Sequence, residues 1–396
     1  MKRRTFIRNS GLASGTLFIP SFLKSSDVFL KGASSDKKLV IIQLSGGNDG
    51  LNTLVPYTND IYYKNRKSIA LVKNNIIPIN DELGLHSSMK AFNALYDAGY
   101  ISIIQNVGYP NPNRSHFRST DIWQTASNAN DYLQTGWVGR YLDEVSKSPL
   151  GAIEVDDTLS LLLKGENVNG LATKDARLFY KVTRNTYFGN ALKYQTDPHL
   201  SEHNLGYLYK TMISAKSSAS YIYEKTKTNK TNQEYPANVF GKQLKTISNF
   251  INSGLTTQIY YASLGGFDTH ANQPNRQARL LTQYSEGLST FVNDLKSKGA
   301  FKNTLILTFS EFGRRVKQNA ARGTDHGAAN LVFLTGESLK NPGLFNTPAN
   351  LLDLDKNGDI KYEIDFREIY ATILENWLGV ASSKIISEDF KPLSII

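Results

Sequence analysis

Residues that can hold a metal ion follow several apolar, β-branched runs of this sequence. Four runs end in polar, ligand-capable side chains, and a fifth polar cluster precedes another run. These side chains belong to Asn48 and Asp49, to Arg114, Ser115 and His116, to Asp268 and His270, to Glu311 and Arg314, and to Asp325 and His326. The chain contains no cysteine. Carboxylates and imidazoles without thiols suit zinc, manganese, iron or a similar divalent ion, and grouped carboxylates repel one another unless a cation lies among them.

Each of these motifs by itself has an ordinary structural explanation. Asp268 and His270 fit a turn, and Asp325 with His326 fits the cap of a helix or the end of a strand. Their placement next to successive strands favours a shared site instead, because parallel sheets place ligands in the crevice beyond the carboxyl ends of their strands.

The elements that position these residues alternate between strands and helices. Continuous apolar runs predict strands at 38–44, 101–105, 258–263, 304–309 and 331–334. Apolar residues at helical spacing predict helices at 85–98, 119–127, 136–145, 240–251, 277–298 and 366–378. This alternation predicts an α/β fold with a mostly parallel sheet sandwiched by helices.

Composition predicts one large domain with an insertion. Residues 36–396 are enough for a single large domain, and residues 156–236 within it are rich in Lys, Asn, Thr and Tyr, with weaker periodicity. We interpret this segment as an inserted cap. The formal net charge of +10 is spread along the chain and is not clustered with aromatic residues, so no nucleic-acid partner is expected.

The first 35 residues have the layout of a twin-arginine (Tat) export signal. Arg3 and Arg4 are followed by Phe6 and a mildly apolar run at 11–23, which is too short and too rich in Gly and Ser to span a bilayer. The alternative is a basic, disordered N-terminus. The signal predicts export to the periplasm or cell envelope, with the Tat translocase as the partner during export.

Two further motifs are incomplete and a third is absent. The loop at 45–50 lacks the Lys-Ser/Thr ending of a phosphate loop, and the segment at 353–358 begins like a calcium loop but has Ile364 at its twelfth position. No Gly-x-Ser-x-Gly elbow follows any expected strand, which argues against an α/β hydrolase with a Ser-His-Asp triad.

The motifs in combination resemble a Tat-exported bacterial family within the alkaline phosphatase, sulfatase and cofactor-independent phosphoglycerate mutase superfamily. The resemblance covers nearly the whole chain and implies an alkaline phosphatase-like domain. It is carried by Gly-Gly-Asn-Asp-Gly at 46–50, Arg-Ser-His-Phe at 114–117, Gly-Phe-Asp-Thr-His at 266–270, Ser-Glu-Phe-Gly-Arg at 310–314 and Thr-Asp-His-Gly at 324–327.

The resemblance implies one or two divalent metal ions, zinc, manganese or similar, and hydrolysis of a phosphate or sulfate ester. The substrate would be a small anionic ester or a polysaccharide-derived one. The implied metal ligands are Asp49, Asp268, His270, Glu311 and His326.

The resemblance also implies a hydroxyl nucleophile. Ser115 lies in the interval where it belongs, with His116 beside it as a general acid, and Ser119 and Thr120 compete for the role. We prefer Ser115 because it follows its strand more closely. The residues expected to bind the substrate are Arg114, Arg314 and Asn48.

One departure from the superfamily pattern keeps two functions open. Where the superfamily has Asp-His after a later strand, this chain has Glu311 followed by Phe312, so a second metal would lose an imidazole. The first function is an exported metal-dependent hydrolase. The second is a non-catalytic binding or assembly protein of the cell envelope with a degenerate metal site.

Overall fold

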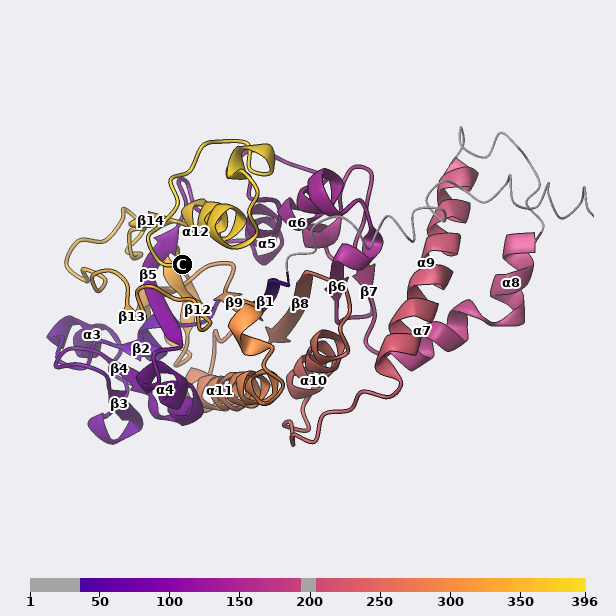
Figure 1. Cartoon of the computed structure of the whole chain (residues 1–396). Helices are drawn as coiled ribbons and strands as arrows, with labels where there is room; N and C mark the ends of the chain where they lie inside the picture. The colour runs from indigo at the N-terminus through magenta and orange to yellow at the C-terminus, as the bar shows by residue number, and fades with distance from the viewer. Residues whose placement is uncertain (1–35, 194–203) are drawn as a thin grey trace, which may run out of the picture. The chain divides into compact units, whose positions relative to one another are not determined.

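A mostly parallel, nine-stranded sheet forms the centre of the fold (Figure 1). The structure is a computed structural model that describes residues 36–193 and 204–396. The strand order is β13-β5-β12-β9-β1-β8-β6-β7, and β14 also pairs with β5. The strands are β1 (Lys38–Ser45), β5 (Ile101–Gly108), β6 (Ala152–Glu154), β7 (Leu171–Ala172), β8 (Ile259–Gly265), β9 (Thr304–Phe309), β12 (Asn330–Thr335), β13 (Gly343–Leu344) and β14 (Ile364–Asp365).

One strand runs against the others. β12 is antiparallel to both of its neighbours, β5 and β9, whereas the remaining pairings in this sheet are parallel. β1, β5, β9 and β12 are buried along nearly their whole length, as continuous apolar runs require in a sheet covered on both sides. The predicted α/β class with a mostly parallel sheet is confirmed.

Helices cover the two faces of the sheet (Figure 1). The helices of one face belong to one apolar cluster and those of the other face to a second cluster. On one face lie α5 (His116–Thr125), α6 (Trp137–Tyr141) and α12 (Phe366–Thr372), and on the other lie α4 (Lys90–Asp97), α10 (Val239–Asn252) and α11 (Gln273–Ser297).

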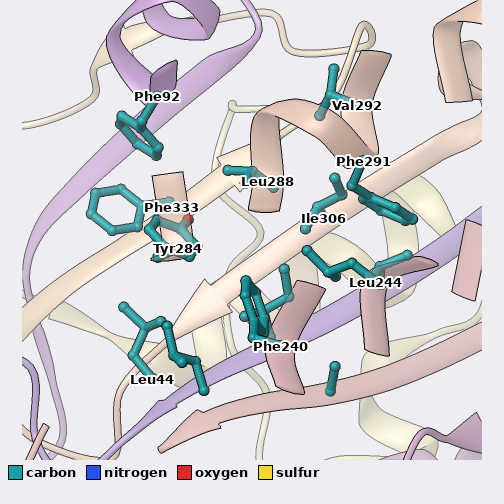
Figure 2. Close-up of a cluster of buried hydrophobic side chains, with 14 of the residues drawn as sticks. Leu44, Phe92, Phe240, Leu244, Tyr284, Leu288, Phe291, Val292, Ile306 and Phe333 are labelled. Atoms are coloured by element: carbon teal, nitrogen blue, oxygen red, sulfur yellow. The ribbon is translucent and has the colours of Figure 1, made fainter. Parts of the chain in front are cut away.

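The apolar stripe of α11 anchors the second of these faces. Its buried residues include Leu281, Tyr284, Leu288 and Phe291, at the i, i+3 and i+4 spacings of a single helical face. Figure 2 shows this stripe beside side chains of the sheet, including Ile306 of β9, and of α10.

The sheet brings the polar loops to one edge. In the parallel register Ser45 of β1 pairs with Gly265 of β8, and Gln43 pairs with Phe309 of β9, so these three strands end together. Because β12 runs in the opposite direction, its first residue, Asn330, lies at the same edge and donates from Nδ2 to the backbone oxygen of Asn48 at 2.9 Å. The segments that follow β1, β8 and β9 therefore meet.

Smaller elements complete the described chain. Two outlying sheets consist of β2 (Leu54–Val55), β3 (Ile76–Pro78) and β4 (Gly84–His86), and of β10 (Arg314–Gln318) and β11 (Thr324–His326). The remaining helices are α3 (Asp60–Asn65), α7 (Ala176–Thr183), α8 (Thr186–Lys193) and α9 (Asn204–Thr226).

Three expected helices begin at least three residues away from the expected position, one of them α11, which begins at Gln273 instead of residue 277. The helix expected from residue 85 begins at Lys90, because residues 84–86 form β4 and pair with β2 and β3. The helix expected from residue 119 begins earlier, at His116, directly after the extended residue Ser115.

The segment interpreted as an insertion contains the strand β7 and the helices α7, α8 and α9. β7 lies at the end of the strand order of the central sheet. The proposed Tat signal at 1–35 lies outside the described residues. None of the described helices has both the length and the apolar character needed to cross a membrane.

Glu154 is a buried carboxyl group at the end of β6. It is 5% exposed, and its Oε2 accepts a hydrogen bond from the backbone nitrogen of Ser160 at 2.7 Å. Burial raises its pKa from 4.5 to about 7, although the bond from Ser160 opposes this shift. Because the folded state holds this proton more tightly than the unfolded state, the stabilisation is complete below pH 4.5 and is lost as the pH rises through about 7.

We expect Glu154→Gln to remove this pH dependence, because a glutamine does not ionise. Glu154 should lower the wild-type free energy of unfolding by about 3 kcal/mol between roughly pH 4.5 and pH 8. Urea unfolding at both pH values measures the difference, with the exposed Glu337→Gln as the control. An equal pH dependence in wild type and Glu154→Gln would contradict the assignment.

Candidate metal centre

Three histidine side chains converge on one carboxylate oxygen. The Nε2 atoms of His116, His270 and His326 lie 3.4, 3.0 and 3.2 Å from Oδ1 of Asp268. One ligand atom each of His116, Asp268 and His326 can be chosen so that all three lie within 4.8 Å of one another. We call His116, His270, His326 and Asp268 the histidine cluster.

The opposite nitrogen of each ring is held by an oxygen atom. The acceptors are Oε1 of Glu311 at 2.9 Å from Nδ1 of His116, Oδ1 of Asp325 at 3.2 Å from Nδ1 of His270, and the backbone oxygen of Arg114 at 2.7 Å from Nδ1 of His326. Carboxylate and carbonyl oxygens accept hydrogen bonds, so each Nδ1 carries a proton, and in the neutral ring Nε2 would be the nitrogen available to a cation. Histidine ligands of metals are oriented in this way.

Two of the Nε2 atoms lie within hydrogen-bonding distance of each other, so a proton or a cation must lie between them. Nε2 of His270 lies 2.9 Å from Nε2 of His326, and Nε2 of His116 is buried without a hydrogen-bond partner in the described part of the chain. Two unprotonated nitrogens at this distance repel each other unless a proton or a cation lies between them. The cluster therefore fits a divalent ion with nitrogen and oxygen ligands, such as zinc.

Hydrogen bonds and burial shift the pKa values of the cluster residues in different directions. The hydrogen bond to Glu311 raises the pKa of His116, whereas burial lowers the pKa of His326. Partial burial would raise the pKa of Asp268, but hydrogen bonds from Arg314 and His326 outweigh it and hold that pKa well below its usual range. Asp268 is therefore an anion at neutral pH and can neutralise a cation.

Each histidine comes from a different part of the chain. His116 lies in the first turn of α5, His270 in the loop after β8 and His326 at the end of β11. The ring of Phe312 packs against His116 and His326, with centroids 4.8 and 4.6 Å apart. Phe312, which stands where the superfamily pattern has an imidazole, therefore packs against two rings of the cluster.

The structure places two of the expected ligands behind the cluster. Glu311 is 1% exposed, and its Oε1 accepts from the backbone nitrogen of Gly46 at 2.7 Å as well as from His116. Asp49 is fully buried, with its Oδ2 2.5 Å from a guanidinium nitrogen of Arg66 and bound by Gln273. Arg66 therefore pairs with Oδ2 of Asp49, where the resemblance had implied a metal ion, whereas Oδ1 of Asp49 is buried without a hydrogen-bond partner in the described part of the chain.

The three side chains expected to bind the substrate have other partners. Arg314 is buried and donates to backbone oxygens, Asn48 is 1% exposed and accepts from Thr53 and Gln277, and Arg114 pairs with Asp359. Buried Arg314 and Asn48 offer no surface to a substrate. The segment that begins like a calcium loop also contacts this arginine, because Asp355 lies 3.6 Å from Arg114.

A pocket of about 390 Å³ opens beside the cluster. Its lining residues are Ser45, Gly46, His116, Phe117, Thr120, Asp121, Gly266, Asp268 and Glu311. Ser115 is exposed and is not among them, whereas Thr120 is. Ser119 is buried, and its Oγ lies within 2.8 Å of the hydroxyl of Tyr109 and of the backbone oxygen of Glu311.

Sequence reasoning missed the positioning role of Asp325 and the partner of Asp49. Asp325 directly precedes His326, so the sequence shows the motif. The contact of Asp325 with His270 cannot be inferred from the sequence. No sequence pattern pointed to Arg66, because it lies at the end of α3, outside every motif.

We expect the chain to bind one zinc ion and Asp268→Asn to weaken this binding by at least about 100-fold. That loss should exceed the one expected for a residue that only orients a ligand, because Asp268 faces all three imidazoles. Competition with a chromogenic chelator measures the affinity, and the exposed Asp157→Asn serves as the control. Unchanged zinc affinity in Asp268→Asn would exclude the site.

Asp325→Ala should weaken zinc binding by about 10- to 100-fold without loss of fold, because the side chain is half-exposed and only orients His270. Asp325→Asn, which keeps an oxygen acceptor, should lose less. Chelator competition and circular dichroism give the two readouts. Wild-type affinity in Asp325→Ala would show that His270 does not depend on this contact.

Several solved structures resemble the fold at low sequence identity. The lipoteichoic acid synthase LtaP from Listeria monocytogenes has 10% identity and a TM-score of 0.42, covering 88% of this chain and 73% of its own. The C-terminal periplasmic domain of EcEptC from Escherichia coli, in a complex with Zn, has 12% identity and a TM-score of 0.40, covering 92% and 94%. The phosphonate monoester hydrolase SpPMH from Silicibacter pomeroyi has 8% identity and a TM-score of 0.41, covering 91% and 76%.

The family comparison covers the sheet and the whole histidine cluster. No curated protein matches the chain. Residues 36–387 match the family described as "Protein of unknown function (DUF1501)". The chain therefore belongs to the DUF1501 family.

Proposed function

We propose that this chain is an exported metal-dependent hydrolase of phosphate or sulfate esters, acting in the periplasm or cell envelope. The observation that carries the proposal is the convergence of three histidine Nε2 atoms on one oxygen of Asp268 beside an open pocket. The paired arginines at Arg3 and Arg4 support export through the Tat translocase.

The histidine cluster has the donors for one ion. A divalent ion held by His116, Asp268, His270 and His326 would polarise an ester oxygen and lower the pKa of a bound water. The orienting groups Glu311, Asp325 and the Arg114 carbonyl keep the three rings in place before any ligand arrives.

A second ion has fewer donors in this chain. Asp49 is neutralised by Arg66, and Glu311 is occupied by Gly46 and His116. Phe312 supplies a ring without a donor atom. We therefore propose a single ion for the hydrolytic site.

Two hydroxyl groups remain candidates for attack on phosphorus or sulfur. Thr120 lines the pocket with Asp268 and lies 3.5 Å from Nε2 of Gln43, whereas Ser115 does not line it. We therefore assign the attacking or orienting hydroxyl to Thr120 and retain Ser115 as the alternative.

One observation favours the second function, a non-catalytic envelope protein that keeps the fold and an ion. Among the described residues that line the pocket there is no arginine or lysine, although a transferred phosphoryl or sulfuryl group carries negative charge. In the hydrolase, the ion itself would have to supply this positive charge.

We expect zinc- or manganese-loaded protein to hydrolyse p-nitrophenyl phosphate or p-nitrophenyl sulfate. Thr120→Val should lower kcat/KM by about 100-fold, because it removes the expected hydroxyl from the pocket lining, while Ser115→Ala should stay near wild type. Initial rates with each variant provide the measurement, and Asp268→Asn serves as the metal-site control.

The reverse pattern, with loss in Ser115→Ala alone, would return the hydroxyl role to Ser115. If the metal-loaded wild type turns over neither ester while binding zinc with the expected affinity, the hydrolase proposal fails and the envelope-protein function replaces it.

A further inference from the structure

An exposed aromatic ring stands at the pocket beside the histidine cluster. Phe117 is 87% exposed, the highest fraction among the large apolar side chains of the described residues, and it follows His116 in α5. Leaving such a side chain in water forgoes roughly 1.5–3 kcal/mol of burial. A ring in this position is available to a ligand that enters the pocket.

The same face of α5 supplies polar groups. Thr120 and Asp121 follow Phe117 at the i+3 and i+4 positions, and all three line the pocket. Within the described part of the chain, the carboxylate of Asp121 makes no hydrogen bond and no ion pair. Its oxygens are therefore free to accept from hydroxyl groups of a ligand.

Two glycines also line the pocket. Gly46 has φ +116°, and a Cβ there would lie 2.4 Å from the backbone nitrogen of Asp268, so this position excludes a side chain. Gly266, with φ +110°, and Ser45 are further lining residues. The pocket volume of about 390 Å³ lies within the roughly 300–1,000 Å³ of small-molecule sites.

The charge of the lining limits what the pocket accepts. Asp121 and Glu311 are its carboxylates besides Asp268, and no described lining residue is an arginine or lysine. Away from the histidine cluster, the charged side chains that line the pocket are carboxylates, which repel an anionic group. The part of a ligand that reaches Phe117 and Asp121 should therefore be neutral and rich in hydroxyl groups.

We infer that this part of the pocket binds a neutral pyranose ring. The face of Phe117 packs against the C–H groups of the sugar, because the negative face of an aromatic ring attracts them, and Asp121 accepts hydrogen bonds from sugar hydroxyls. This inference rests on the proposed function only for the role of the sugar as the alcohol part of the ester. Sugar binding itself needs no turnover.

Saturation-transfer difference NMR tests the inference on zinc-loaded protein. The probes are the methyl β-pyranosides of glucose, galactose, mannose and N-acetylglucosamine, which carry no charge. We expect saturation of the ring protons of at least one probe, and about tenfold weaker binding in Phe117→Ala and in Asp121→Ala. Tyr187→Ala, which removes an equally exposed ring of α8, is the control and should bind like the wild type.

The outcomes separate this inference from the proposed function. Absence of saturation transfer to every probe, or an unchanged signal in Phe117→Ala, would overturn the sugar site even if nitrophenyl esters are hydrolysed. Probe binding that depends on Phe117 and Asp121 would support the sugar site even if no ester is hydrolysed, in which case the proposed hydrolysis alone fails.

Discussion

The guanidinium group of Arg314 ties together the loops on which the candidate site depends. It is fully buried, and its nitrogens donate to Oδ1 of Asp268 at 2.8 Å and to backbone oxygens of three separate segments. These acceptors are the oxygens of Gly46, Gly47, Phe267 and Thr324. A buried arginine is stable only when its donors are satisfied, so the loops after β1 and β8 and the β10–β11 hairpin are held in one arrangement.

Charge balance explains why the cluster can form around a partly exposed carboxylate. Asp268 forms an ion pair with Arg314 and also contacts three imidazoles, and Asp49 forms an ion pair with Arg66. The charges of Asp49 and Asp268 are therefore each matched locally by an arginine. The parallel strands bring acidic residues together, and the arginines decide which of them remains open to an ion.

The pocket beside this centre combines two different surfaces. One end carries the histidines and Asp268, where a charged group can be held. The other carries the exposed ring of Phe117 and the unpaired carboxylate of Asp121 on one face of α5. This division suits a ligand with one charged and one neutral, hydroxylated part, and both ends of it involve α5, which also supplies His116 of the cluster.

The amino-acid sequence by itself determined the α/β class, most strands and helices of the sheet layers, and the residue types that gather at its edge. Continuous apolar runs and helical spacing report burial locally, so they are readable from the chain alone. Only the tertiary structure decided that His116 faces Asp268, that Glu311 orients a ring, and that Arg314 and Arg66 are occupied inside the protein. These roles depend on which donor meets which acceptor through space, and pairing between residues that lie 17 to 195 positions apart leaves no local pattern.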